Sequence, residues 1–196
     1  MTTVFKRVFD VLLSLGSLVL FAPVMLVIYV LIKKEDPDGD VIYAQDRVGL
    51  GGETFKLYKF RSMHMNAEAE NLPQLYSGED DPRLTKVGKF IRAHHLDEFP
   101  QLWNVLKGEM SFVGPRPERQ FYIDQILEHN PDYVKLYALR PGLFSYATLY
   151  NGYTDTMEKM LKRLDYDLQY LEDYSFWTDI KIIYLTSISI IFGKKF

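Results

Sequence analysis

Cysteine is absent from the 196 residues of the chain, which excludes disulfide bonds, thiolate catalysis and cysteine-ligated zinc. An excess of positive charge is missing as well, because 23 basic and 26 acidic residues leave a net charge of −3 and an isoelectric point near 5.8. The chain as a whole is therefore not a polycation that binds nucleic acid, and no nucleic-acid partner is expected.

Several familiar catalytic motifs are also absent. The sequence contains no G-x-S-x-G, no P-loop and no G-x-G-x-x-G ahead of a helix. The four histidines do not have the spacing of a metal-binding triad: His64, His94, His95 and His129. What remains is an ordinary globular composition, with 47% hydrophobic and 25% charged residues, in a chain long enough for one domain with a short appendage.

The strongest compositional feature is an uncharged run near the N-terminus. Residues 11–32 contain 22 residues without a charge, and a straight helix of that length would be ~33 Å long, about one hydrocarbon core. Hydropathy alone therefore favours a single-span anchor. Pro23 in the middle of the run favours a kinked helix instead, because it removes a backbone hydrogen bond.

The charges that flank this run are symmetric: Lys6, Arg7, Lys33 and Lys34. The positive-inside rule then gives a spanning helix no orientation. Basic residues at both ends suit a re-entrant helix hairpin over residues 1–34, whose two ends lie at one anionic leaflet. The single span and the re-entrant helix both stay open on the residues alone, and the second is preferred.

The remaining residues, 35–196, read as a mainly helical α+β domain. Residues 41–45 and 54–61 are expected to form a small β-hairpin around a glycine-rich loop. Residues 63–76 permit a helix broken at Pro73, and residues 77–82 read as a loop. Further helices are expected over 86–95 (capped by Thr85), 102–107 (ended by Gly108), 120–128, 131–137 and 155–174. Residues 177–192 read as a helix that is either buried or, preferably, lies in the membrane interface.

The most informative local signal is Asp97-Glu98-Phe99-Pro100. If Asp97 caps a helix, Pro100 falls at the third helical position, where its missing N–H costs nothing. Two carboxylates would then lie at the positive end of a helix dipole. A plain capping aspartate with an acidic first turn is the simpler alternative.

Basic side chains surround this pair in the sequence and are candidates for binding phosphate: Lys56, Lys59, Arg61, Arg92, Arg116 and Arg140. Arg116 is held between Pro115 and Pro117, which lowers the entropy lost when it is used. Scattered, solvated charge is the alternative. The residues alone are equally compatible with a magnesium-dependent phosphate enzyme and with a membrane-bound module that binds lipid.

Four motifs carry a family resemblance: Tyr58-Lys-Phe-Arg-Ser-Met63, Leu96-Asp-Glu-Phe-Pro-Gln-Leu-Trp-Asn104, Met110-Ser-Phe-Val-Gly-Pro-Arg-Pro-Glu118 and Arg140-Pro-Gly142. In these motifs, and from about Phe5 to the C-terminus, the chain resembles the bacterial sugar transferases, the small monotopic phosphoglycosyl transferases. The resemblance implies transfer of a sugar 1-phosphate from a UDP-sugar to polyprenyl (undecaprenyl) phosphate with release of UMP.

The resemblance also implies roles for single residues and a location. It makes Asp97 the nucleophile that forms a covalent aspartyl-phosphosugar, and Glu98 a ligand of Mg²⁺. It implies a re-entrant N-terminal helix, with amphipathic interfacial helices around a catalytic core on the cytoplasmic face of the bacterial inner membrane. A non-catalytic membrane scaffold that binds polyprenyl phosphates or pathway partners is the alternative function. A homodimer is left open, and the sequence identifies neither the sugar nor the glycan pathway.

Overall fold

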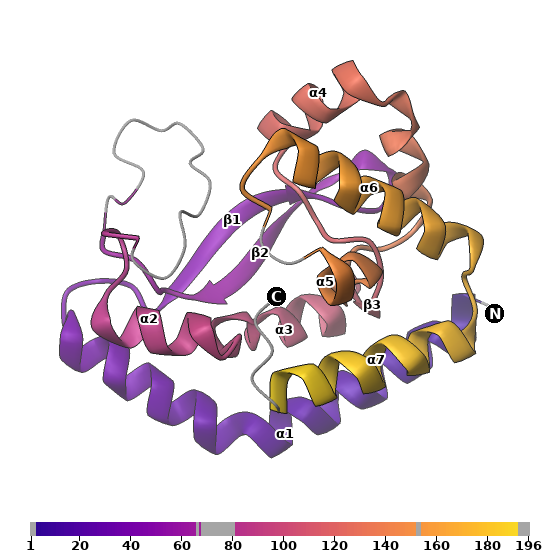
Figure 1. Cartoon of the computed structure of the whole chain (residues 1–196). Coiled ribbons are helices and arrows are strands. Elements are labelled where there is room, and N and C mark those ends of the chain that lie inside the picture. The colour runs from indigo at the N-terminus through magenta and orange to yellow at the C-terminus, as the bar shows by residue number, and fades with distance from the viewer. Residues whose placement is uncertain (1–2, 66, 68–80, 152–153, 192–196) are drawn as a thin grey trace.

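The computed structural model describes residues 3–65, 67, 81–151 and 154–191, and Figure 1 shows their arrangement. A long helix, α1 (Thr3–Glu35), runs along one side of the molecule. The remaining elements form a mainly helical domain above it that contains two small sheets. The expected break at Pro73 and the loop over 77–82 lie outside the described residues, apart from Asp81 and Pro82.

Helix α1 is apolar, continuous and bent. It is long and apolar enough to cross a membrane, and only 11% of its most apolar window is buried in the fold. Pro23 lies inside it, and Figure 1 shows that the helix bends near its middle. The expected apolar helix is therefore confirmed over Thr3–Glu35 as one bent helix, and its re-entrant course in a membrane stays a prediction.

The first half of α1 packs against the domain through polar side chains. Lys6 forms an ion pair with Asp179. The carboxylate of Asp10, only 2% exposed, accepts hydrogen bonds from the backbone N–H of Phe112 (3.0 Å) and the hydroxyl of Ser111 (3.1 Å). These groups are buried and paired, which holds this half of the helix in place.

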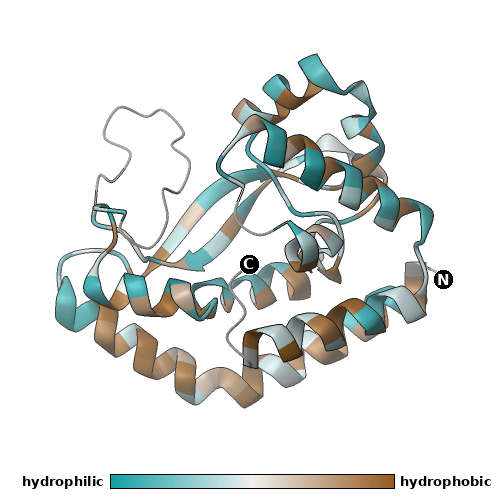
Figure 2. Ribbon diagram, viewed as in Figure 1, coloured by the Kyte–Doolittle hydropathy of each residue, from teal (hydrophilic) through white to brown (hydrophobic). Residues whose placement is uncertain are grey.

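The second half of α1 packs against the same domain through apolar side chains and its polar end. Ile28 and Ile32 are buried in a cluster with Phe60 and Ile91. The carboxylate of Glu35 accepts hydrogen bonds from the first two backbone N–H groups of the next helix, α2 (Lys86–Ala93), at 2.8 and 3.1 Å. Both ends of α1 are thus fixed to one domain, while many apolar side chains between them are exposed. Figure 2 shows that α1 is mostly hydrophobic along its length.

The predicted β-hairpin is confirmed. Strands β1 (Ile42–Val48) and β2 (Thr54–Phe60) pair antiparallel in a register that places Tyr43 opposite Lys59 and Asp46 opposite Lys56. Between them, the short 3₁₀ turn η1 (Leu50–Gly52) needs positive φ angles of 69° and 79° at its last two residues, which only glycine adopts without strain.

The expected helices are present in the expected order as α3 (Gln101–Lys107), α4 (Gln120–His129), α6 (Met157–Glu172) and α7 (Phe176–Ile191), with the 3₁₀ segment η3 (Pro131–Ala138). The short helix α5 (Tyr146–Tyr150) and the 3₁₀ segment η2 (Leu96–Glu98) were not expected. Thr85 caps α2 by accepting the N–H of Gly88, and Gly108 ends α3 with a φ of 89°, both as predicted. Residues 131–137, expected as a short α-helix, form the 3₁₀ segment η3 instead.

A second sheet was not expected. Strands β3 (Ser111–Val113) and β4 (Gly142–Phe144) pair in parallel. Their close approach depends on glycine, because a Cβ at Gly142 would lie 2.1 Å from the backbone nitrogen of Gly114. The Arg140-Pro-Gly142 motif therefore has a structural role in joining these two strands.

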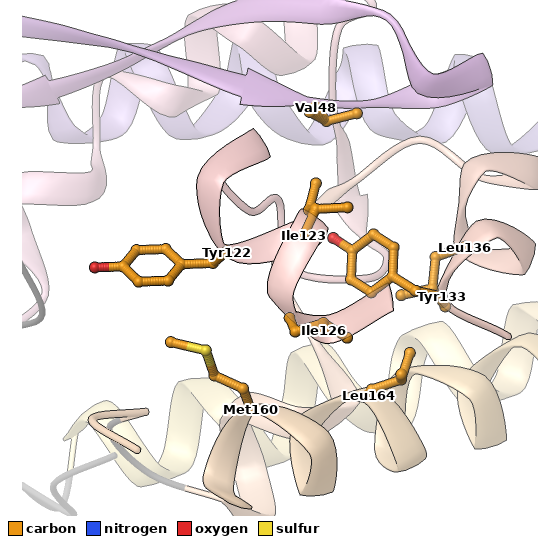
Figure 3. Close-up of a cluster of buried hydrophobic side chains, with 8 residues drawn as sticks. All are labelled: Val48, Tyr122, Ile123, Ile126, Tyr133, Leu136, Met160 and Leu164. Carbon is orange, nitrogen blue, oxygen red and sulfur yellow. The ribbon is translucent and has the colours of Figure 1, made fainter. Parts of the chain in front are cut away.

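The largest buried cluster lies between the end of β1, α4, η3 and α6 (Figure 3). Its members are Val48, Tyr122, Ile123, Ile126, Tyr133, Leu136, Met160 and Leu164. Helix α7 lies beside the first half of α1 (Figure 1), with Ile182 fully buried while Trp177 and Tyr184 are exposed. One face of this helix is thus buried and the other is exposed, and its place in the membrane interface stays a prediction.

Candidate active site

The backbone around the acidic pair differs from the expected helix cap. Asp97 and Glu98 lie in the 3₁₀ turn η2, whereas α3 begins at Gln101 with Pro100 at its N-cap position. The prediction that Asp97 caps the helix is therefore wrong. The reason is His95, which adopts a left-handed conformation (φ 56°) and starts a separate turn. A hydrogen bond from the Glu98 N–H to the His95 carbonyl closes this turn. This turn directs Asp97 inward, where it is only 4% exposed.

Glu98 binds two cations from different parts of the chain. One of its carboxylate oxygens, Oε1, accepts hydrogen bonds from Lys59 Nζ at 2.8 Å and from Arg116 Nη2 at 3.1 Å. Burial alone would raise the pKa of Glu98, but the attraction of Lys59 and Arg116 outweighs burial and holds the pKa well below its usual range. Glu98 is therefore ionised, and it fixes both cations beside Asp97.

The pKa of Asp97 is shifted upward, opposite to that of Glu98. Burial is the main reason that its pKa is raised, and the charge of Glu98 adds to the effect. The positive charges of Lys59 and Arg92 oppose it. A carboxylate in this position is poorly hydrated and surrounded by cations, which are the conditions that activate an oxygen nucleophile toward a phosphate.

Helix α6 holds the segment that carries Arg116. The backbone N–H of Arg116 donates a hydrogen bond to Asp167 Oδ2 at 3.3 Å. One helical turn earlier, Arg163 donates to Glu118, which also accepts from Arg47. Glu118 stays ionised because Arg163 and Arg47 overcome its burial and lower its pKa to about 2. The Arg116 segment is thus held by two buried carboxyl groups, those of Asp167 and Glu118.

Asp167 carries a measurable cost at neutral pH. Its Oδ1 atom is buried without a partner, and burial raises its pKa from 3.8 to about 7. Between these pH values only the unfolded chain loses the proton, so this group's contribution to stability declines as the pH rises. Asp167→Asn still accepts the Arg116 N–H but cannot ionise. We therefore expect the melting temperature of the variant, relative to that of wild type, to be about 5 °C higher at pH 8 than at pH 5. An equal difference at the two pH values, measured by thermal unfolding, would contradict this account.

The other predicted basic residues have different surroundings. Arg61 donates to the carboxylate of Asp36 and the carbonyl of Asp40, and so connects the end of α1 to β2. Arg140 donates to the carbonyl of Gly108 at 2.8 Å, next to the C-terminus of α3. Arg92 acts on Asp97 and Lys59 through its charge. The structure therefore brings together Asp97, Glu98, Lys59, Arg92 and Arg116, and the phosphate-binding roles of Arg61 and Arg140 stay predictions.

Two residues near the acidic pair were not singled out as site residues. His95 lies close enough to both carboxylates to interact with their charges, but burial is the larger effect and lowers its pKa. Its position two residues before Asp97 is the only sequence signal for it. Asp167 lies 51 residues after Arg116, and no local pattern connects the two.

A metal site built only of protein groups is not evident in the described part of the chain. No group of three or more histidine, cysteine, aspartate or glutamate residues converges there. Adjacent carboxylates do suit Mg²⁺, which is usually held by one or two carboxylates together with substrate phosphates and water. Asp97 and Glu98 fit that kind of shared site.

Comparisons with known proteins assign the chain to a family. The bacterial sugar transferase family model matches residues 1–193. A UDP-N-acetylgalactosamine-undecaprenyl-phosphate N-acetylgalactosaminephosphotransferase of Aeromonas hydrophila is 39% identical over 96% of this chain and 44% of its own length. A UDP-glucose:undecaprenyl-phosphate glucose-1-phosphate transferase of Klebsiella pneumoniae is 42% identical over 93% of this chain and 39% of its own length. A transferase of the same name from Caulobacter vibrioides is 40% identical over 92% of this chain and 67% of its own length. The chain spans less than half of the first two relatives, and it belongs to the bacterial sugar transferase family.

Proposed function

We propose that the chain transfers a sugar 1-phosphate from a UDP-sugar to undecaprenyl phosphate and releases UMP. The observation that carries this proposal is the buried Asp97 beside an ionised Glu98 that holds Lys59 and Arg116. The names of the relatives support the substrate classes, since they include UDP-glucose, UDP-N-acetylgalactosamine and undecaprenyl phosphate.

The chemistry divides into two displacements at one phosphorus. A carboxylate oxygen of Asp97 attacks the phosphorus that bears the sugar, and the bond from that phosphorus to the bridging oxygen breaks, so UMP leaves with the electron pair. A phosphate oxygen of the lipid then attacks the same phosphorus and releases the Asp97 carboxylate. In this proposal Lys59 and Arg116 bind the phosphate oxygens in both steps, and their shared contact with Glu98 beside Asp97 supports that role.

Mg²⁺ is the proposed cofactor, with Glu98 as its principal protein ligand. When bound together with the diphosphate, the ion would neutralise charge that develops on the phosphate oxygens. Glu98 also keeps Lys59 and Arg116 in place, so its proposed role has two parts.

We further propose that α1 enters only one leaflet, on the cytoplasmic face of the inner membrane. The support is that Asp10 near one end and Glu35 at the other both bind the same domain. A spanning helix would have to separate its ends by about 30 Å of hydrocarbon. A lipid phosphate at headgroup depth would then be accessible to the catalytic domain.

Cysteine labelling tests this topology. The native chain has no cysteine, so single replacements at Thr3 and Asp38 report without background. We expect neither thiol to react with a membrane-impermeant reagent in intact cells, and both to react after permeabilisation. Labelling of position 3 alone from outside would establish a spanning helix. Pro23→Leu, which restores the missing backbone donor, is expected to shift the population toward that spanning form.

A UMP-release assay tests the proposed function. A panel of UDP-sugars is supplied with undecaprenyl phosphate and Mg²⁺, and UMP is quantified for wild type and for Asp97→Asn. We expect release with at least one donor for wild type and none for the variant. Binding of the lipid without UMP release from any donor would favour the non-catalytic scaffold.

A further inference from the structure

A pocket outside the acidic pair has no role in the chemistry described so far. It has a volume of about 340 Å³ and lies between β1 and the first turn of α4. Its lining includes two aromatic rings, two amides and a guanidinium: Tyr43, Phe121, Gln45, Gln120 and Arg119. Aromatic faces with a few polar groups are typical of a small-molecule site.

Two connections place this pocket next to the catalytic residues. Tyr43 pairs with Lys59 across the β-hairpin, so both side chains lie on the same face of the sheet, about 5 Å apart at their Cβ atoms. Lys59 in turn contacts Glu98. From the other wall, Arg119 lies three residues after Arg116, which contacts the same Glu98 oxygen. One wall of the pocket therefore shares a sheet face with Lys59, and the other wall follows Arg116 in the sequence.

One wall of the pocket is held by a chain of hydrogen bonds. Gln45 Nε2 donates to the Tyr43 hydroxyl at 3.1 Å, and Arg47 donates to Gln45 Oε1 at 2.6 Å. Arg47 also donates to the buried Glu118 at 2.6 Å. Tyr43 is thus oriented before any ligand binds, which reduces the entropy lost on binding.

We propose that this pocket binds the uridine part of the donor. The inference rests on the proposed function, and it adds a nucleoside site that is separate from the acidic pair. A uracil ring can stack on Tyr43 or Phe121, as bases do on aromatic side chains. Its imide group presents both a donor and acceptors, which the amides of Gln45 and Gln120 complement.

The position of the pocket favours the nucleoside over the lipid. Helix α4 lies on the opposite side of the molecule from α1 (Figure 1), so the pocket wall formed by its first turn is far from the apolar face of α1. UMP is the water-soluble product of the first displacement and must leave before the lipid phosphate attacks. A site with one wall on the side away from α1 lets the nucleotide leave into water while the acceptor arrives from the membrane side.

Equilibrium binding of UMP and of inorganic diphosphate tests the assignment. Both probes are titrated calorimetrically into the full chain in lipid nanodiscs with Mg²⁺. We expect Tyr43→Ala and Phe121→Ala each to weaken UMP binding about tenfold and to leave diphosphate binding unchanged. Both side chains are 44% exposed, so their truncation leaves the buried core intact. Phe90→Ala, which removes a similarly exposed ring outside the pocket, is the matched control.

The outcomes separate the two proposals. If wild type binds UMP and the pocket variants bind it equally well, the uridine site is wrong while the proposed reaction stands. If the variants weaken binding of the UDP-sugar but not of UMP, the pocket holds the sugar, and the uridine assignment is again wrong. If wild type binds neither UMP nor any UDP-sugar, the proposed function fails and the pocket assignment fails with it.

Discussion

Asp97→Asn is expected to lower turnover by at least about 10³-fold, because it removes the attacking oxygen anion. Asparagine has nearly the same size and can still accept a hydrogen bond, so the turn at residues 96–98 should persist. Its amide is, however, a very poor nucleophile toward phosphorus. Multiple-turnover UMP release by the purified variant measures the effect.

The matched control for this substitution is Asp165→Asn, which changes an exposed aspartate on α6. It should leave turnover within a factor of about two, as surface substitutions usually do. Substantial turnover by the Asp97→Asn protein, with the same far-UV circular dichroism spectrum as wild type, would disprove the role of Asp97 as the nucleophile.

Glu98→Gln is expected to lower kcat/KM by about 10²-fold or more, which is the usual effect of losing a placed charge in an active site. Glutamine keeps the shape but no longer neutralises Lys59 and Arg116, and it binds Mg²⁺ more weakly. The variant should therefore need more Mg²⁺ for half-maximal activity, which a metal titration of the rate measures. Glu158→Gln, on the exposed side of α6, serves as the control.

A second measurement separates positioning from loss of folding in Glu98→Gln. The charge of Glu98 contributes to the raised pKa of Asp97. Removing that charge should move the acidic limb of the pH–rate profile to lower pH, because Asp97 then stays ionised further into acid. An unchanged rate, or a lower rate with an unchanged acidic limb and unchanged Mg²⁺ requirement, would contradict the proposed role.

Local sequence signals predicted much of the fold. The hairpin followed from alternating strands around glycines, and α2 and α3 followed from Thr85 and Gly108 at their ends. These features depend on neighbouring residues, so a short window contains their cause. The strand pair β3–β4 has no local sequence signal, because it joins residues 111–113 to residues 142–144 through the close contact of two glycines. Its cause therefore lies in two distant parts of the chain.

The sequence likewise predicted some of the candidate site residues correctly, while it could not place others. Asp97, Glu98, Lys59 and Arg116 were all predicted, and the structure brings them together. Arg61 illustrates the limit, because it has the same charge and lies two residues from Lys59, yet it binds Asp36. Side chains two residues apart on an extended strand point to the same face, so spacing alone does not distinguish Arg61 from Lys59. Tertiary packing decides which of the two reaches Glu98.

The cap at Asp97 failed for a conformational reason. A proline three residues after a short polar residue is compatible with a capped helix, but the left-handed His95 starts a separate 3₁₀ turn first. Left-handed backbone at a residue other than glycine is uncommon and is held by its surroundings. Its presence beside the acidic pair is therefore part of how the fold positions the carboxylates.

Omitting the acceptor tests the central claim most directly. Wild-type protein is mixed with its UDP-sugar and Mg²⁺ but no lipid phosphate, and the intact protein and its peptides are weighed by mass spectrometry. We expect one equivalent of UMP and a mass increase of one sugar phosphate on the peptide that contains Asp97. Release of UMP only when undecaprenyl phosphate is present, with no adduct on the protein, would show direct transfer between the substrates and contradict the account.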